Sequence, residues 1–161
     1  MTSRNALRRA VAFATCAAVL IPTTAAARTL VGTPGKDRLV GGPNGNHVIN
    51  GDGGGDKIYG GAGADRLLGE WGGDDVFGYG GDDHLDGSSG GDILFGHGGN
   101  DHMLGGFGGD HMTGGPGDDF IDGDNPFPPP PCGPPFPPGD NNDVCSGGPG
   151  ANVVQNCESV S

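Results

Sequence analysis

Aliphatic side chains recur once in every nine residues between Gly32 and Asp122, separated by glycine, aspartate and other mostly polar residues. Each is the eighth residue of a nine-residue repeat, and together they are Leu39, Ile49, Ile58, Leu67, Val76, Leu85, Leu94, Met103, Met112 and Ile121. Positions seven to nine can form only a very short strand, in which side-chain alternation directs position eight inward and its neighbours outward. One apolar residue cannot bury itself, so two such units should close one rung of a coil that stacks on further copies. The pattern predicts an all-β parallel solenoid over residues 28–122, with equivalent residues eighteen apart.

Glycine occupies the first and fourth positions of every repeat, and one extra residue, Gly41, interrupts the phase after the first repeat. Glycine at fixed offsets is expected where the backbone adopts positive φ or approaches another segment closely, so positions one to six predict a tight turn. A flexible glycine-rich linker would not keep an aspartate and an aliphatic residue in phase with these glycines. The glycines therefore support the stacked fold.

The sixth position of the repeat is aspartate in every copy but one, where His47 replaces it. Stacking at about 4.8 Å per rung would align these carboxylates in two mutually repelling columns, one on each edge. A hard cation between consecutive turns, bound by carboxylates and main-chain carbonyls, would neutralise them, and flexible oxygen-only coordination favours calcium. The predicted ligands are Asp37, Asp56, Asp65, Asp74, Asp83, Asp92, Asp101, Asp110 and Asp119.

The nonapeptide resembles the G-G-x-G-x-D-x-U-x repeat of RTX (repeats-in-toxin) proteins, a calcium-binding parallel β-helix repeat. The resemblance implies a parallel β-roll with about seven ions between successive turns. The implied pairs are Asp37 with Asp56, Asp56 with Asp74, Asp74 with Asp92, Asp92 with Asp110, Asp65 with Asp83, Asp83 with Asp101, and Asp101 with Asp119. His47 should spoil the site it would share with Asp65, and the slip at Gly41 calls the pair of Asp37 and Asp56 into question.

Residues 1–27 have the features of an export signal. Three arginines precede an apolar run at residues 10–21, which is too short to span a bilayer, and residues 25–27 form a small-residue cleavage site. The mature chain should therefore begin near Arg28 and be secreted, in the extracellular space or at the cell surface. No later segment resembles a membrane span.

Removal of this segment would take away three positive charges and no acids, so the formal net charge falls from −12 to −15. Seven divalent calcium ions would nearly cancel that charge, which predicts a chain that is swollen without calcium and compact with it. An acidic chain without a basic patch is a poor nucleic-acid binder. The composition thus indicates metal-coupled folding and argues against a nucleic-acid partner.

The repeat pattern breaks after Asp122, and a proline-rich loop is expected over residues 123–138. Degenerate repeats and a cap follow over residues 139–161. The ending resembles that of small secreted RTX-type proteins of actinobacteria, which implies a disulfide between Cys145 and Cys157. On the residues alone, Cys132 could equally pair with Cys145 and staple the loop to the roll.

The outward ninth position places Tyr59, Phe77 and Phe95 one rung apart on one face. This ladder either packs on itself or forms a contact surface for another copy, a protein or a glycan. His84 and His102 are expected to be ordinary surface histidines. No HExxH, GxSxG or phosphate-loop motif is present. We therefore expect a non-enzymatic calcium-binding protein with a structural or adhesive role, or alternatively a calcium-tuned module that docks a partner.

Overall fold

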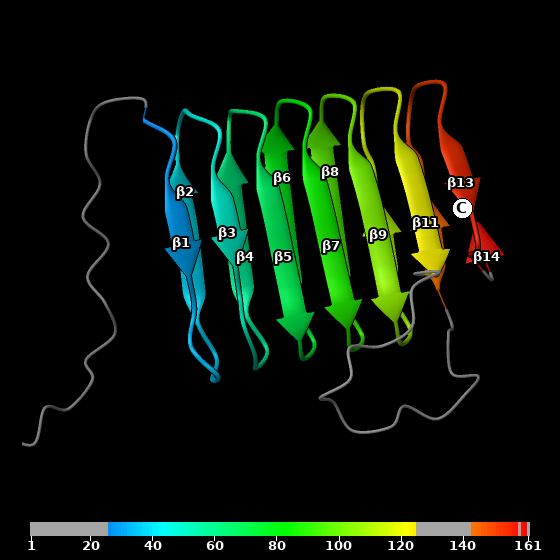
Figure 1. The fold of residues 1–161 in the computed structure, drawn as a ribbon. Helices are drawn as coiled ribbons and strands as arrows, with labels where there is room; N and C mark the ends of the chain where they lie inside the picture. The colour runs from blue at the N-terminus through cyan, green and yellow to red at the C-terminus, as the bar shows by residue number, and fades with distance from the viewer. Residues whose placement is uncertain (1–25, 125–142, 158, 161) are drawn as a thin grey trace, which may run out of the picture.

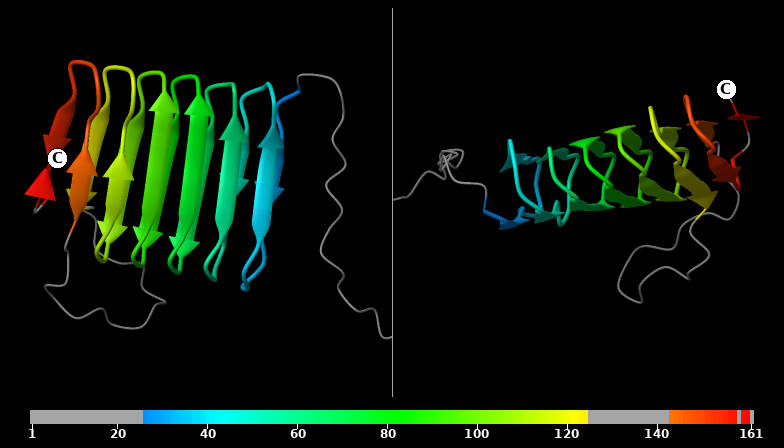
Figure 2. Two further views of the ribbon diagram at one scale, coloured as in Figure 1. Left: turned by 180° about the vertical axis from the view of Figure 1, so that it is seen from behind. Right: turned by 90° about the horizontal axis from the view of Figure 1, so that it is seen from above.

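The computed structural model describes residues 26–124, 143–157 and 159–160. The described chain forms two parallel seven-stranded sheets that lie face to face and extend along one axis (Figure 1). Figure 2 shows the same sheets from behind and from above, as two layers joined by turns. The predicted all-β parallel β-roll is therefore confirmed. Most of the predicted signal segment, most of the proline-rich segment and Cys132 lie outside the described residues.

Successive strands alternate between the two sheets, so each rung contributes one strand to each layer. The first sheet contains β1 (Thr29–Val31), β3 (Val48–Asn50), β5 (Arg66–Trp71), β7 (His84–Ser89), β9 (His102–Phe107), β11 (Phe120–Asp124) and β13 (Val153–Gln155). The second sheet contains β2 (Arg38–Gly42), β4 (Lys57–Gly61), β6 (Asp75–Gly80), β8 (Ile93–Gly98), β10 (His111–Thr113), β12 (Val144–Ser146) and β14 (Ser159–Val160). None of the described segments is a helix long and apolar enough to cross a membrane.

The core lies between the sheets and consists of the aliphatic residue at position eight of each repeat. In the first sheet Leu67 is in register with Leu85, and in the second Val76 is in register with Leu94. The fully buried members are Ile49, Ile58, Leu67, Val76, Leu85, Leu94, Met103, Met112, Ile121 and Cys145. The predicted inward position is thus confirmed, and each rung buries only two such side chains.

The central strands are longer than predicted, and the turns are correspondingly shorter. Strands β5 to β9 have six residues each, so they continue through the first three positions of the following repeat. The glycine at position one therefore lies in a strand and faces inward. A Cβ on Gly69 would lie 2.8 Å from the carbonyl oxygen of Gly87 and would also meet the carboxylate of Asp74. This close packing requires glycine at position one, whereas positive φ requires it at position four, as at Gly72 with φ 132°.

The extra residue of the N-terminal repeats lies in a turn and not at Gly41. Gly42 pairs with Gly61, which occupies position two of its repeat, so Gly41 takes position one. The insertion is therefore accommodated between Gly42 and the positive-φ Gly45. Because a turn absorbs it, the register of β2 with β4 is preserved, and Asp37 stacks on Asp56 despite a separation of 19 residues.

The C-terminal repeats rejoin the same stack after the proline-rich segment. Strand β12 pairs with β10 at a separation of 33 residues in place of the usual 18, so the intervening segment carries 15 additional residues. Cys145 lies in the aliphatic column and forms a disulfide with Cys157. The alternative pairing of Cys145 with Cys132 is therefore excluded. The disulfide-closed C-terminal end is confirmed.

Candidate metal centre

The aspartates at position six line the two edges of the roll, at the turns that precede each strand. We call the set before the second sheet the long column: Asp37, Asp56, Asp74, Asp92, Asp110 and Asp143. We call the set before the first sheet the short column: Asp65, Asp83, Asp101 and Asp119. The structure therefore brings together all nine predicted residues, as two separate columns and not one cluster.

One oxygen of each carboxylate holds the stack together. The main-chain N–H of Asp74 donates to Oδ1 of Asp92 at 2.8 Å, and that of Asp83 donates to Oδ1 of Asp101 at 2.9 Å. The same bond recurs along both columns, always from one rung to the next. These hydrogen bonds fix each carboxylate in the turn, so its second oxygen has a defined direction.

The second oxygen, Oδ2, is buried and has no hydrogen-bond partner along most of both columns. This holds for Asp56, Asp65, Asp74, Asp83, Asp92, Asp101 and Asp119, whose side chains are all at most 3% exposed. A buried carboxylate oxygen without a partner costs several kcal/mol when charged, so such groups are normally paired with a cation or protonated. The columns therefore need a proton or a positive charge at each turn.

Main-chain carbonyl oxygens accompany these carboxylate oxygens. A Cβ on Gly51 would lie 2.5 Å from Oδ2 of Asp56 and 2.7 Å from the carbonyl oxygen of Gly69, so the two oxygens flank one point. Asp56 and Gly69 belong to repeats that lie one rung apart on the same edge. No three His, Cys, Asp or Glu side chains converge within the described residues, so a cation here would need carbonyl ligands as well. An oxygen-only donor set of this kind fits calcium.

Burial also changes the proton affinity of the columns. Desolvation raises the pKa of Asp92 to about 9 and that of Asp83 to about 7, although the main-chain N–H that each accepts opposes the shift. The same cause raises the pKa of Asp74 and of Asp101 to about 6. The effect is largest in the middle of the stack, where burial is deepest. Without a cation, ionising these carboxyl groups at neutral pH works against the fold.

A family model for the RTX calcium-binding nonapeptide repeat matches residues 44–76, 77–112 and 95–125, which together span about half of the chain. The chain belongs to the RTX calcium-binding repeat family. RTX nonapeptide repeats bind Ca²⁺, in agreement with the oxygen donors along the two columns. No curated protein and no solved structure matches the chain.

The two ends of the RTX array differ from its middle. Oδ2 of Asp37 accepts hydrogen bonds from the main-chain N–H of Thr33 at 2.6 Å and from its hydroxyl at 2.8 Å. His47 takes the place of an aspartate at the start of the short column, and its ring is buried. Asn152 ends that column, where its Oδ1 accepts the N–H of Asp119 at 2.8 Å. The short column is therefore bounded by residues without a carboxylate.

Two features of the columns went beyond the predicted ligand set. Asp143, which the spacing of the degenerate repeats places in the aspartate position but which was not among the predicted ligands, lies in the long column, where its Oδ1 accepts the N–H of Asp110 at 2.9 Å. On the other edge, position five carries a second hydrogen-bonded ladder, in which Asn100 N–H donates to Asp82 and Asp118 N–H donates to Asn100. The sequence already contained a signal for this ladder: position five on this edge is Asp82, Asn100 and Asp118 in three successive rungs, whereas on the other edge it is mostly glycine.

Proposed function

We propose that this chain is a secreted, non-enzymatic calcium-binding β-roll with a structural or adhesive role in the extracellular space. The carrying observation is the row of buried aspartate Oδ2 atoms without hydrogen-bond partners, which a bound cation would satisfy. A disulfide fits the same setting, because disulfides persist in oxidising compartments. Residues 1–27 would then be the export signal. The proline-rich loop, expected over residues 123–138, would begin only after Asp124, because Gly123 and Asp124 belong to β11.

The calcium ions would be held between consecutive turns of each column. The seven predicted pairs use Asp37, Asp56, Asp65, Asp74, Asp83, Asp92, Asp101, Asp110 and Asp119, and stacking of Asp110 on Asp143 adds one pair, which makes eight. Bound calcium would supply positive charge to the carboxylates, and the chain's contribution is to fix each carboxylate through its N–H hydrogen bond. Eight divalent ions would carry 16 positive charges against the −15 of residues 28–161.

Replacement of Asp83 by asparagine tests the proposal, because Asp83 lies inside the short column and would serve two sites. Asn152 shows that an amide can accept the same N–H, so Asp83→Asn should keep the hydrogen-bonded stack while removing the charge. We expect the calcium concentration for half-maximal folding to rise about tenfold or more, from the loss of a charged ligand. Calcium titration followed by calorimetry and circular dichroism measures it.

Two matched variants accompany this measurement. Asp82→Asn changes the adjacent, exposed carboxylate at position five and should leave the midpoint nearly unchanged. Asp37→Asn changes an end of the long column and should have a smaller effect than Asp83→Asn, because losing a terminal unit uncouples one interface and losing an interior unit uncouples two. Equal midpoints for Asp83→Asn and Asp82→Asn would contradict calcium binding by the short column.

A second candidate function is partner binding through the aromatic face of the second sheet. Tyr59, Phe77 and Phe95 stack with centroid separations of 5.2 and 5.5 Å, and Tyr79 stacks on His97 at 5.1 Å. Tyr79 and His97 occupy position two with φ of 79° and 73°, a conformation that costs side-chain-bearing residues roughly 1–2 kcal/mol each. The same positive φ recurs at position two of other repeats, at Asp52, Glu70 and Ser88. This conformation is therefore a feature of the repeat, and the exposed aromatic surface itself is what favours a role in recognition.

The geometry of this face favours a protein partner or a second copy over a glycan. Interplanar angles of 8° and 7° mean that neighbouring rings of the ladder are stacked face to face, so that their edges point outward. Sugar rings generally stack on open aromatic faces. A pull-down in calcium should therefore recover a protein that is lost with Phe77→Ser and Phe95→Ser but kept with Leu68→Ser and Leu104→Ser on the other sheet. Recovery unaffected by the phenylalanine changes would contradict the recognition role.

A further inference from the structure

Two residues without a carboxylate, Arg28 and His47, precede the short column on the same edge of the roll and lie one rung apart. Thr29 pairs with Val48, and the N–H of Val48 donates to the carbonyl oxygen of Arg28 at 2.8 Å. One rung later, the N–H of Arg66 makes the same bond to the carbonyl oxygen of His47 at 2.8 Å. Arg28 therefore occupies the sixth position of the first rung, where the other rungs carry His47 or an aspartate.

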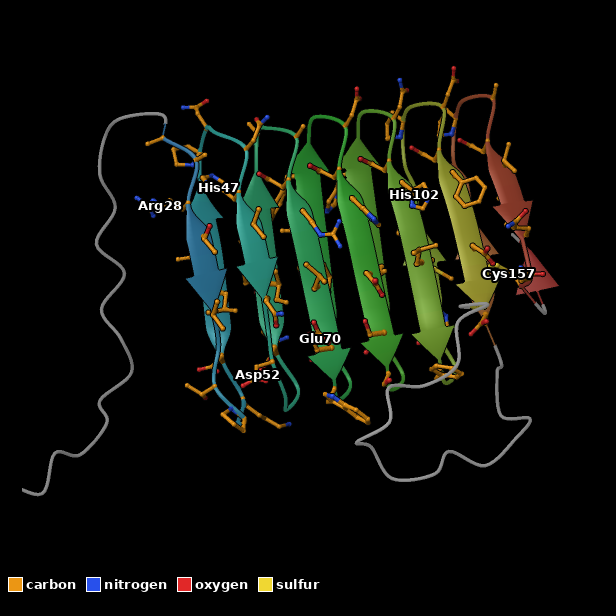
Figure 3. All side chains as sticks on the ribbon, viewed as in Figure 1. Arg28, His47, Asp52, Glu70, His102 and Cys157 are labelled. Carbon is orange, nitrogen blue, oxygen red and sulfur yellow. A yellow bond between two sulfur atoms is a disulfide. The ribbon has the colours of Figure 1, made fainter. Side chains whose placement is uncertain are left out.

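Arg28 makes hydrogen bonds like those of the aspartates at position six of the other rungs, but with a guanidinium in place of a carboxylate and an imidazole as the acceptor. Its main-chain N–H donates to Nδ1 of His47 at 3.2 Å, as the N–H of Asp65 donates to a carboxylate oxygen of Asp83 at 2.8 Å. Its guanidinium Nη1 donates to the carbonyl oxygen of Gly41 at 3.1 Å. Figure 3 shows Arg28 beside His47 at the N-terminal end of the stack.

The carbonyl oxygen of Gly41 corresponds to the carbonyl oxygens that accompany the buried carboxylates elsewhere in the roll. Gly41 is the position-one glycine of the repeat that carries His47, just as Gly69 is the position-one glycine of the repeat that carries Asp74. The oxygen of Gly69 flanks the buried Oδ2 of Asp56 in the preceding turn. The guanidinium of Arg28 therefore binds the carbonyl oxygen of Gly41 from the preceding turn. The equivalent carbonyl oxygens further along the roll would be ligands for a cation.

The imidazole of His47 fills the place of the missing carboxylate. A Cβ on Gly41 would lie 2.5 Å from Cδ2 of His47, whereas a Cβ on Gly60 would lie 2.5 Å from Oδ2 of Asp65. The His47 side chain is only 2% exposed. This turn pair therefore offers no carboxylate oxygen to a metal ion, and it already contains a group that is positively charged at any accessible pH.

We propose that the guanidinium of Arg28, supported by His47, replaces calcium at the first turn pair of the short column. This inference rests on the proposed function, because it assumes that the aspartate pairs further along the column bind calcium. The N-terminal rung would then close with a cation supplied by the chain itself. In a nearest-neighbour stack, such a rung gives the following, calcium-dependent rungs a formed edge on which to pair.

Ion counting by native mass spectrometry of the full chain in calcium tests the proposal. The double variant Arg28→Asp with His47→Asp would create carboxylates at both positions, and we expect it to bind two more ions than the unchanged chain, one between positions 28 and 47 and one between position 47 and Asp65. Arg28→Gln keeps a donor and removes the charge, and we expect the same ion count but a calcium midpoint for folding several-fold higher. Circular dichroism in calcium checks that each variant retains its strands.

A folded double variant with fewer than two additional ions would overturn the inference, because His47→Asp alone restores the site shared with Asp65. If the double variant does not fold, Arg28→Gln decides it: an unchanged midpoint, or the loss of one ion, would show that the guanidinium does not stand in for calcium. An unchanged chain that binds no calcium at all would instead contradict the proposed function. The two failures are therefore distinguishable.

Discussion

Removal of calcium at neutral pH is expected to unfold the roll almost completely. The core supplies two aliphatic side chains per rung, and no other buried apolar cluster is present in the described residues. Against this thin core stand two columns of buried carboxylates whose charges would repel one another. Excess chelator should therefore abolish the strand signal in circular dichroism and expand the hydrodynamic radius. Restored calcium should recover both, with a midpoint on the order of 0.1–1 mM.

Two controls separate loss of calcium from other causes of unfolding. Magnesium at the same concentration should not restore the strands, because it demands a smaller and more regular coordination shell. The disulfide between Cys145 and Cys157 should remain oxidised in chelator, so its loss cannot explain the transition. A strand-rich spectrum that persists in excess chelator at neutral pH would contradict the proposed dependence on calcium.

Acid is expected to stabilise the roll when calcium is absent, contrary to the usual effect of acid on proteins. Burial raises the pKa of the folded aspartates above 3.8, so the folded chain binds more protons than the unfolded chain between about pH 4 and each folded pKa. Stability is therefore greatest below pH 4 and falls as the pH rises through 6 for Asp74, 7 for Asp83 and 9 for Asp92. The raised pKa of Asp92 alone makes the calcium-free fold less stable at neutral pH than in acid, by roughly 4 kcal/mol in the free energy of unfolding.

Circular dichroism of calcium-free protein between about pH 4 and neutral pH measures this effect. Strand content should be high at the acid end and should disappear as the pH approaches neutrality, whereas in excess calcium it should change little. Asp92→Asn should move the transition toward higher pH, because the amide does not ionise. Loss of strands on acidification in the absence of calcium would contradict the interpretation that protons replace calcium at these carboxylates.

The period of nine was sufficient to predict the core and the stacking of the aspartates into columns. Leu85 and Met103 lie where alternation around position eight directs them, and Asp83 and Asp101 lie in one column because their separation equals one rung. These features depend only on spacing. The same reasoning placed the aromatic residues Tyr59 and Phe77 one above the other, and their rings do stack.

The features that could not be predicted depend on three-dimensional contacts within a turn. Spacing alone cannot distinguish an insertion at Gly41 from one between Gly42 and Gly45, since only the pairing of Gly42 with Gly61 decides it. Strand length was underestimated because a glycine at position one was attributed to a turn, whereas Gly69 lies in a strand against Asp74 and Gly87. Arg28 was missed because an arginine shares no chemistry with the aspartate whose position it occupies.

The direction of the hydrogen bonds gives the roll a particular response to mechanical force. All bonds between rungs run along the axis of the stack, and the first and last strands lie at opposite ends of it (Figure 1). A pull between the two ends would load the outermost rungs first. The disulfide between Cys145 and Cys157 closes the C-terminal end, so the chain would peel off one rung at a time from the N-terminal end. Each rung of 18 residues would lengthen the chain by about 60 Å when released. A chain anchored at both ends would thus act as an extensible tether, whose resistance to each step is set by the calcium in its surroundings.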